Sequence, residues 1–237
     1  MKRCLFFTLF LLCATISYPQ ARLTEAHEFD QFQKAGGGGV AAFKTGVNTE
    51  ADGSQFFLPD WSKGNIELNS NIVFNEGLLL IYDKVRQEIF IKQEDSAVVL
   101  LGTKEDIKSF TLKDADKEYN FINSAFFSNT KPEIYYQVLV MDPSKLTLLK
   151  YTKSTFVKAD NTDMMKQREG KVNDSFVDHI TYYISNGKGS LEPIQLKTKS
   201  VKKAFTELKI NVDKYLSDHA EPINEDYLIA MVGALNQ

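Results

Sequence analysis

The feature that most restricts how this chain folds is a succession of short apolar runs between residues 55 and 196. The runs are rich in β-branched and aromatic residues, and clusters of turn residues separate them. This spacing predicts antiparallel strands joined by short turns, because parallel neighbours would need a long crossover between them. The predicted strands cover residues 65–68, 71–74, 77–83, 88–92, 97–101, 107–112, 119–123, 134–141, 147–151, 155–158, 176–185 and 191–196.

Turn residues mark several of the connections. Asn186 and Gly187 lie between two predicted strands, and an Asn-Gly pair tolerates the positive φ angles of a tight type I′ hairpin turn. Residues 142–145 (Asp-Pro-Ser-Lys) predict a similar turn. Residues 160–173 form the longest polar insertion, and we expect them to be an exposed loop.

The apolar spacing changes from that of a strand to that of a helix after residue 198. Pro222 interrupts the helical pattern, and Asn224 is placed to cap a final helix that has acidic residues in its first turn. Each helix therefore carries one apolar stripe. The stripe residues are Val201, Ala204, Phe205 and Leu208, then Val212, Tyr215 and Leu216, then Tyr227, Leu228, Met231, Val232 and Leu235.

These patterns predict an α+β fold that is mainly antiparallel β. We expect a curled or closed meander of roughly ten strands with C-terminal helices, and a β-sandwich is the alternative. A single β-rich domain should cover residues 55–237, with its helical part from about residue 198. Residues 22–54 form a leader segment, in which a short helix ends at Gly36–Gly39. The leader is expected to be partly flexible or to pack as a sheet edge.

The N-terminus has the pattern of a signal peptide over residues 1–21. Lys2 and Arg3 precede an uncharged apolar run over residues 4–16, which is too short for a comfortable membrane span. Small residues follow, so we expect the mature protein to begin between residues 18 and 22. Export to the periplasm or the extracellular space is the prediction, and a short membrane anchor that stays attached is the alternative.

Both cysteines of the chain, Cys4 and Cys13, lie in this segment. The mature protein would therefore lack disulfides, thiol catalysis and cysteine metal sites. Its formal charge would be about −5, because the acidic residues number 31 and only two of the 28 basic residues are removed. An acidic chain of this kind gives no attraction for nucleic acid, and no later stretch is apolar enough to span a membrane.

Only three histidines occur, His27, His179 and His219, and their spacing fits no zinc hydrolase. His179 follows Asp178, but neighbours in a strand point to opposite faces, so a structural role for His179 is favoured over an oriented imidazole. The sequence also lacks a Gly-x-Ser-x-Gly nucleophile motif.

Two other segments partly match known ion-binding motifs, a calcium loop and a phosphate-binding loop. Asp114, Asp116 and Glu118 match the first oxygen positions of a calcium loop, but Tyr119 and Ala125 stand where Gly and Glu are needed, which favours a polar turn. The glycines at 36–39 have no following Lys-Ser or Lys-Thr, so a flexible joint is favoured over a phosphate cradle. The sequence thus predicts no catalytic, cofactor-binding or metal-ligating residue.

Aromatic residues are frequent in the predicted strands. They suit cross-strand packing in an ordinary core, or a face that binds sugar or lipid. We expect Trp61, the only tryptophan, to be substantially buried and to anchor the first strand. The lysine-rich stretch at 197–209 is interpreted as a solvated helix face and not as a basic patch. The aromatic residues are Phe56, Phe57, Trp61, Phe74, Tyr82, Phe90, Tyr119, Phe121, Tyr135, Tyr136, Tyr182 and Tyr183.

Residues 53–68 resemble the opening of a group of exported bacterial envelope proteins of unknown function. The shared pattern is Trp-x-x-Gly-x-Ile/Val-x-Leu, here Trp61, Gly64, Ile66 and Leu68. A Tyr-Tyr-Ile hairpin at 182–187 and a helix that begins at about residue 199 are similar to the same group's ending. The resemblance implies an exported domain in a Gram-negative envelope over residues 53–237, and it assigns no catalytic residue.

Two functions remain open from the sequence. The first is a non-enzymatic envelope protein that binds a small ligand or another envelope protein through its sheet or its helical tail. The second is a hydrolase with a carboxylate pair in a cleft of the sheet, which needs no signature motif. The last helix is expected to cover the protein's own sheet, and the alternative is a detachable docking element.

Overall fold

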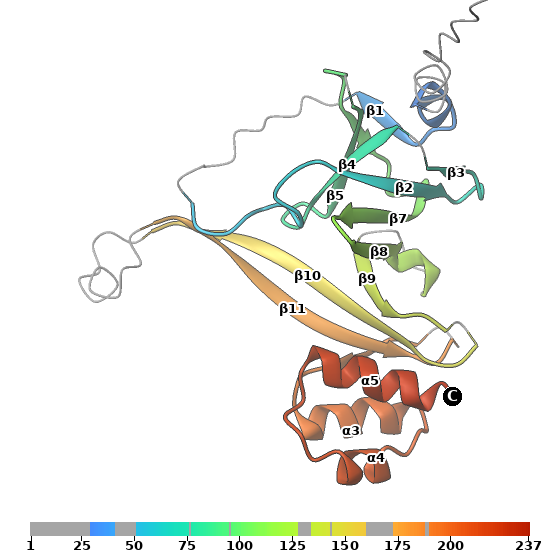
Figure 1. Cartoon of the computed structure of the whole chain (residues 1–237), viewed down its shortest axis with the longest axis vertical. Coiled ribbons are helices and arrows are strands. Elements are labelled where there is room, and N and C mark those ends of the chain that lie inside the picture. Colours follow the sequence, from blue (N-terminus) through green and yellow to red (C-terminus); the bar gives the residue numbers. More distant parts are fainter. Residues whose placement is uncertain are drawn as a thin grey trace, which may run out of the picture.

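The computed structural model describes residues 29–40, 51–75, 77–94, 96–127, 134–142, 144–159, 173–187 and 190–237. The predicted signal peptide, most of the leader segment and nearly all of the insertion at 160–173 lie outside these ranges, as does His27. Within them, twelve strands form one sheet, and three helices follow at the C-terminal end (Figure 1).

The strands have the following bounds: β1 Gly38–Val40, β2 Ser62–Leu68, β3 Val73–Phe74, β4 Leu78–Asp83, β5 Glu88–Gln93, β6 Leu100–Gly102, β7 Ile107–Asp114, β8 Lys117–Asn123, β9 Tyr135–Val140, β10 Thr147–Val157, β11 Ser175–Ser185 and β12 Glu192–Ile194. A 3₁₀ turn, η1 Ser124–Phe126, follows β8. The C-terminal helices are α3 Thr198–Glu207, α4 Asp213–Asp218 and α5 Glu225–Leu235.

The sheet is an antiparallel meander with the strand order β1-β6-β5-β4-β2-β7-β8-β9-β10-β11-β12, and β3 pairs with β2 beside β4. The prediction of an α+β fold with an antiparallel meander is confirmed. The sheet is open and not closed, because β1 and β12 stand at opposite ends of the strand order. It is also one continuous sheet, which differs from the sandwich alternative.

Two elements differ from the sequence pattern. The predicted strands at 147–151 and 155–158 are a single 11-residue strand, β10. The connection after Asn186 and Gly187 is longer than a two-residue turn, because β12 begins only at Glu192, although Gly187 does have the positive φ (74°) that the pattern requires.

The leader residues 29–40 pack onto the sheet. Gly38 pairs with Gly102 of β6, and a side chain at Gly38 would come within 2.6 Å of the Leu101 carbonyl oxygen. Residues 29–34 are helical and bury Phe29 and Phe32 in the main core. The glycine run therefore forms an edge strand, which is the second of the two possibilities left open by the sequence.

The main core lies on one face of strands β2 to β9, where the sheet bends around it. Phe110 and Phe121 stack at its centre with ring centroids 4.7 Å apart. Tyr82 contacts both rings, and Tyr135 contacts Phe110. These aromatic side chains are almost fully buried. Most of the predicted strand aromatics therefore serve as core, as favoured by their alternation with polar residues.

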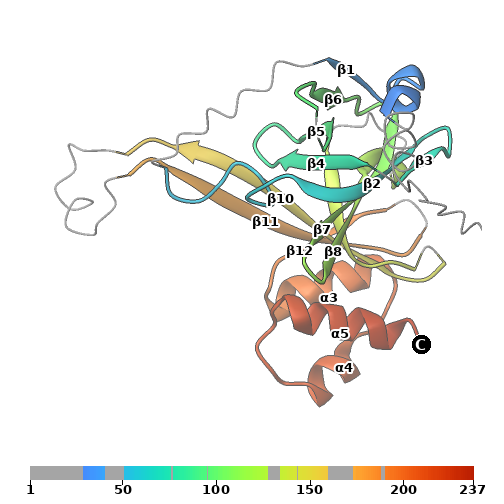
Figure 2. The same cartoon turned by 45° about the horizontal axis from the view of Figure 1, so that its top comes forward.

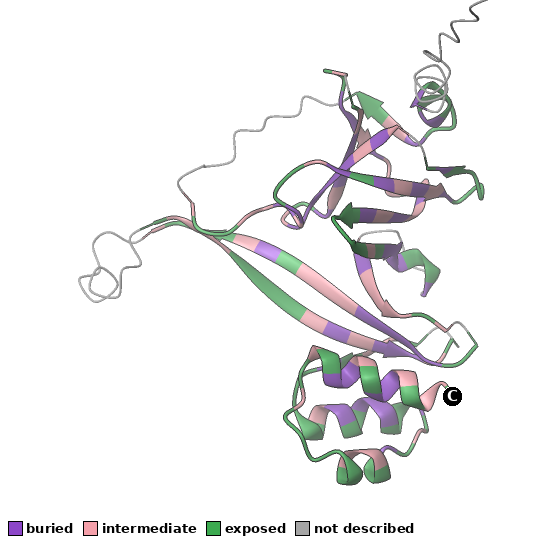
Figure 3. Cartoon of the chain, in the orientation of Figure 1, coloured by how far each residue is buried: buried purple, intermediate pink, exposed green. Residues whose placement is uncertain are grey.

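A second core joins the helices to the far end of the sheet. Figures 1 and 2 place α3 and α5 against one face of β10, β11 and β12. Their buried stripes, purple in Figure 3, include Phe205, Leu228 and Met231, which contact the cluster around Leu148 and Ile184. The helical stripes thus cover the protein's own sheet, as predicted.

Polar contacts fix the start of α5. The side chain of Asn224 accepts a hydrogen bond from the Tyr227 amide at 2.8 Å, which confirms the predicted cap. Glu225 pairs with Lys150 of β10 at 2.7 Å and accepts a hydrogen bond from the Tyr182 hydroxyl of β11 at 2.8 Å. The helix is therefore attached to both long strands as well as packed against them.

Candidate functional site

Strands β10 and β11 pair along their whole length and form a two-stranded ribbon, from Thr147 opposite Ser185 to Val157 opposite Ser175. The half nearest the helices is packed on both sides, whereas the other half extends away from the body of the protein (Figure 1). We call the second half, residues 151–157 and 175–181, the distal ribbon.

The distal ribbon exposes large apolar side chains on both of its faces. Phe156 is 40% exposed, Val157 47%, Val177 42% and Ile180 48%. Neighbouring residues of a strand point to opposite faces, so Ile180 lies on the same face as Phe176 while Val177 lies on the other. Several exposed apolar side chains on one protruding element are typical of interaction surfaces.

One side of the distal ribbon is clamped by the turn between β4 and β5. The Lys84 ammonium lies 2.7 and 2.9 Å from the two carboxylate oxygens of Asp178, and the Ser154 hydroxyl donates a short hydrogen bond to the same carboxylate. The Ser154 amide donates to the Lys84 carbonyl, and the Gln87 side chain donates to the Thr152 carbonyl at 3.1 Å. The clamp holds β10 in a fixed position.

The clamp depends on the ionised form of Asp178. Burial disfavours that form, but hydrogen bonds from Lys84 and Ser154 outweigh burial and hold the pKa of Asp178 below its ordinary value. Because the folded-state pKa is lowered, the stabilisation is complete above the unfolded pKa of about 3.9 and is lost as the pH falls through the folded value.

Replacing Asp178 with Asn should therefore destabilise the protein in a pH-dependent way. At pH 7 the Lys84 side chain, which is 9% exposed, would lose its charged partner, and we expect a loss of about 1–3 kcal/mol of unfolding free energy. The difference from wild type should shrink below about pH 4. Thermal unfolding between pH 7 and pH 3 measures this. Glu118→Gln, in an exposed pair 3.9 Å from Lys113, is the control and should change little. A constant difference at all pH values would contradict the role of the carboxylate.

The face of the sheet opposite the helices carries a group of tyrosines, of which Tyr136 is buried and Tyr151 and Tyr183 are half-buried. Tyr136 and Tyr183 have ring centroids 5.3 Å apart, and Tyr136 and Tyr151 6.1 Å apart. Burial, with the neighbouring tyrosines, raises the pKa of Tyr136 to about 12. These hydroxyls therefore stay protonated at neutral pH, so they supply hydrogen bonds and not charge.

The structure separates Asp178 from His179. Asp178 faces Lys84 and Ser154, whereas the exposed His179 ring lies 3.0 Å from the Thr155 hydroxyl on the other face. His219 stacks on Tyr215 at the end of α4, with ring centroids 4.1 Å apart. Neither arrangement orients an imidazole toward a carboxylate, in agreement with the structural role predicted for His179.

The remaining polar motifs are structural. Asp114 and Asp116 flank the turn between β7 and β8, where Ala115 has a positive φ of 49°, so the polar-turn interpretation is confirmed. The part of the chain that the structure describes contains no group of three or more His, Cys, Asp or Glu residues suited to hold a metal ion. Among the same residues, no helix is long and apolar enough to cross a membrane.

Trp61 is partly buried, as expected, but it does not enter the main core. It lies just before β2 and packs on a small cluster on the side of β4 and β5 away from the main core. The Lys92 ammonium lies 4.9 Å from the centroid of its ring. Trp61 also lines an open hollow of about 460 Å³, together with Lys63 and Lys113. The residues of β2 that enter the main core begin only at Ile66.

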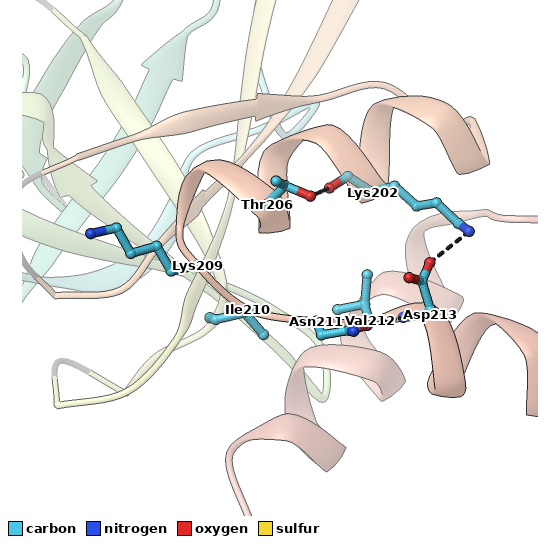
Figure 4. Close-up of a pocket in the computed structure, with 7 residues that line it drawn as sticks. All are labelled: Lys202, Thr206, Lys209, Ile210, Asn211, Val212 and Asp213. Atoms are coloured by element: carbon cyan, nitrogen blue, oxygen red, sulfur yellow. Dashed lines mark hydrogen bonds and ion pairs between the residues drawn. The ribbon is translucent and has the colours of Figure 1, made fainter.

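A second hollow, of about 290 Å³, lies between α3 and α4 (Figure 4). Lys202 and Asp213 form an ion pair of 2.6 Å at one end, and the Thr206 hydroxyl donates to the Lys202 carbonyl. Lys209 points away from this pair in Figure 4. The charges are thus either paired within the protein or exposed, as expected for a solvated helix face.

A carboxylate that acts as a general acid needs a raised pKa. Hydrogen bonding to Lys108 lowers the pKa of Glu67, and the clamp lowers that of Asp178. Neither group therefore suits that role. The distal ribbon was not predicted as a site, because β-branched and aromatic residues are equally common in a strand inside a sheet.

Comparison of the chain with models of protein families, with curated proteins and with solved structures finds no match.

Proposed function

We propose that this protein is an exported, non-enzymatic binding protein that recognises another protein through its distal ribbon. The observation that carries the proposal is the exposure of Phe156, Val157, Val177 and Ile180, each at least 40%, on a protruding ribbon that the β4–β5 turn holds in place. Burying such side chains against a partner would remove apolar surface from water, which drives most protein association.

A protein fits this surface better than a small molecule does. Small ligands bind in concave sites that enclose most of their surface. The distal ribbon is a narrow, protruding element, and its exposed apolar residues lie on both faces. Protein interfaces accommodate this shape, because a partner can wrap around or lie along the ribbon and bury both faces.

The sequence supports export. The charged start and the apolar run within residues 1–21 have the pattern of a signal peptide, and residues 53–237 resemble exported proteins of bacterial envelopes. The hydrolase alternative has less support, because hydrogen bonds lower the pKa values of Glu67 and Asp178, so neither carboxylate suits the general acid of a catalytic pair.

Site-specific photo-crosslinking in cells that express the protein tests the proposal. A photoreactive side chain at Val157 should form an adduct with a defined protein, which is then purified and tested for direct binding. We expect Phe156→Ser combined with Val177→Ser to weaken that binding at least tenfold. The control is Val73→Ser, because Val73 is 54% exposed on β3, outside the ribbon. Equal binding by the ribbon variant and the control would show that the proposal is wrong.

A further inference from the structure

We infer that the outer edge of β11 at residues 177–181 is a strand-addition site, which takes an extended peptide segment of the partner as an additional strand. This inference rests on the proposed function and specifies how the partner is recognised. It follows from the direction of the backbone groups along β11 and from what already occupies the two ends of that edge.

The direction of the backbone groups is set by the hydrogen bonds at both ends of β11. In an antiparallel pair, alternate residues direct their N–H and C=O groups toward the paired strand, and the others direct them away. The Phe176 amide donates to the Asp52 carbonyl at 2.8 Å, so even-numbered residues of β11 face away from β10. The pairing with β12 agrees, because Pro193, which has no N–H, lies opposite the odd-numbered Tyr183.

The outer edge is occupied at both ends and open in the middle. Asp52 bonds to Asp174 and Phe176 at one end, and β12 pairs with residues 182–184 at the other. Between them, Asp178 and Ile180 direct two N–H and two C=O groups outward. Within the ranges that the structure describes, no strand pairs with residues 177–181 on this side. The opening is about 16 Å long, which is the length of a five-residue strand.

The outer edge of β10, on the other side of the ribbon, is not free to take an additional strand. Strand β9 covers β10 at residues 148–150, and the β4–β5 turn bonds to Thr152 and Ser154. Because Lys84 also binds the side chain of Asp178, the backbone of β11 is held in place before any partner arrives. A pre-ordered edge loses little conformational entropy on binding.

A segment of a partner protein fits this opening, whereas a second copy of the chain does not. If two β11 edges paired symmetrically, β12 of one copy and the Asp52 segment of the other would have to share the space between strands only about 4.8 Å apart. A short extended segment avoids this conflict, because it leaves the edge at both ends of the opening. Strand addition of this kind is a recurring mode of peptide recognition.

The side chains beside the opening define the chemistry of the segment. Val177 and Ile180 favour apolar neighbours on opposite faces. His179 is exposed on the edge strand, with the exposed Lys153 behind it on β10, which favours an acidic residue of the segment opposite His179. An antiparallel segment with apolar residues opposite Val177 and Ile180 and a central carboxylate opposite His179 meets these requirements.

The probe is the peptide acetyl-Thr-Val-Glu-Thr-Val-amide, which places its central Glu opposite His179. In the free protein, the amides of Asp178 and Ile180 should exchange with solvent at least 100-fold faster than those of Val177, His179 and Thr181, which bond to β10. Millimolar peptide should slow exchange at Asp178 and Ile180 at least fivefold. A peptide N-methylated at its second and fourth residues, which lacks the required donors, should have no effect. Equal effects of both peptides, or no effect of either, would overturn the inference.

Proline substitution separates this inference from the proposed function. Ile180→Pro removes the outward N–H without removing a bond to β10, and Ile180→Thr keeps that N–H. Both variants should melt within a few degrees of each other, and Ile180→Pro should bind the crosslinked partner at least tenfold more weakly. If Phe156→Ser with Val177→Ser abolishes binding while Ile180→Pro binds like Ile180→Thr, the partner uses the ribbon faces and strand addition is wrong. If neither change affects binding, the proposed function fails as well.

Size-exclusion chromatography should give a monomer. A dimer that Ile180→Pro disrupts would show that a second copy of the chain, and not a partner segment, occupies the edge.

Discussion

Removal of residues 222–237 is expected to abolish the cooperative unfolding of this protein or to make it insoluble. These residues contain α5, whose Leu228, Met231 and Val232 are fully buried. Their loss would uncover the second core, including Leu148 and Ile184 of the ribbon. Exposure of the apolar residues of a whole core cluster favours aggregation. Circular dichroism melting curves and the soluble fraction after expression measure the effect.

Point substitutions within α5 provide the matched comparison. Leu228→Ala should cost about 2–5 kcal/mol, because it leaves a cavity between the helix and the strands. Ile229, on the same helix, is only half-buried, so Ile229→Ala should cost less than half as much. If the truncated protein melts like wild type and only loses its partner, α5 is a docking element and not part of the core.

The second large effect is expected from Phe110→Ala, which should lower the unfolding free energy by about 3–5 kcal/mol. Phe110 is 2% exposed and stacks on Phe121 at the centre of the main core. The loss combines the transfer energy of the ring with the cavity that it leaves among Tyr82, Phe121 and Tyr135. Urea unfolding, with a constant m-value, measures the difference.

Trp61→Ala is the comparison for Phe110→Ala. Although tryptophan is the larger side chain, Trp61 is half-buried and contacts only a small cluster, so its replacement should cost less than Phe110→Ala. An equal or larger cost for Trp61→Ala would show that the outer cluster contributes as much stability as the main core does.

The sequence indicates the strands well because each has its own period-two pattern and its own turn residues. The break between residues 151 and 155 was misleading for a physical reason. Lys153 and Ser154 are polar, yet the strand continues, because Ser154 is buried against Asp178 and the Lys84 carbonyl. A polar residue whose partner lies far away in the chain looks like a turn in the sequence. The sequence leaves open whether the leader forms an edge strand such as β1, because glycines carry no side-chain pattern.

The candidate site was not predictable, because it depends on which strand edges remain unpaired. Val177 and Ile180 lie among polar residues in a segment rich in β-branched and aromatic residues, as many buried strands do. Only the structure reveals that β12 is three residues long and leaves the outer edge of β11 at residues 177–181 without a paired strand among the described residues. Local patterns predict which residues form strands, whereas the exposure of a strand is set by contacts between distant segments.

The pairing of β1 with β6 has a consequence for the order of folding. Gly38 reaches its partner only after the chain has extended to Gly102, and Phe32 needs β2 to β7 around it before it is enclosed. In a chain that leaves a ribosome or a translocation channel from its N-terminus, residues 29–40 emerge first but dock late. Until then, Phe29 and Phe32 stay accessible to chaperones, so this segment becomes native only after the strands that follow it have formed.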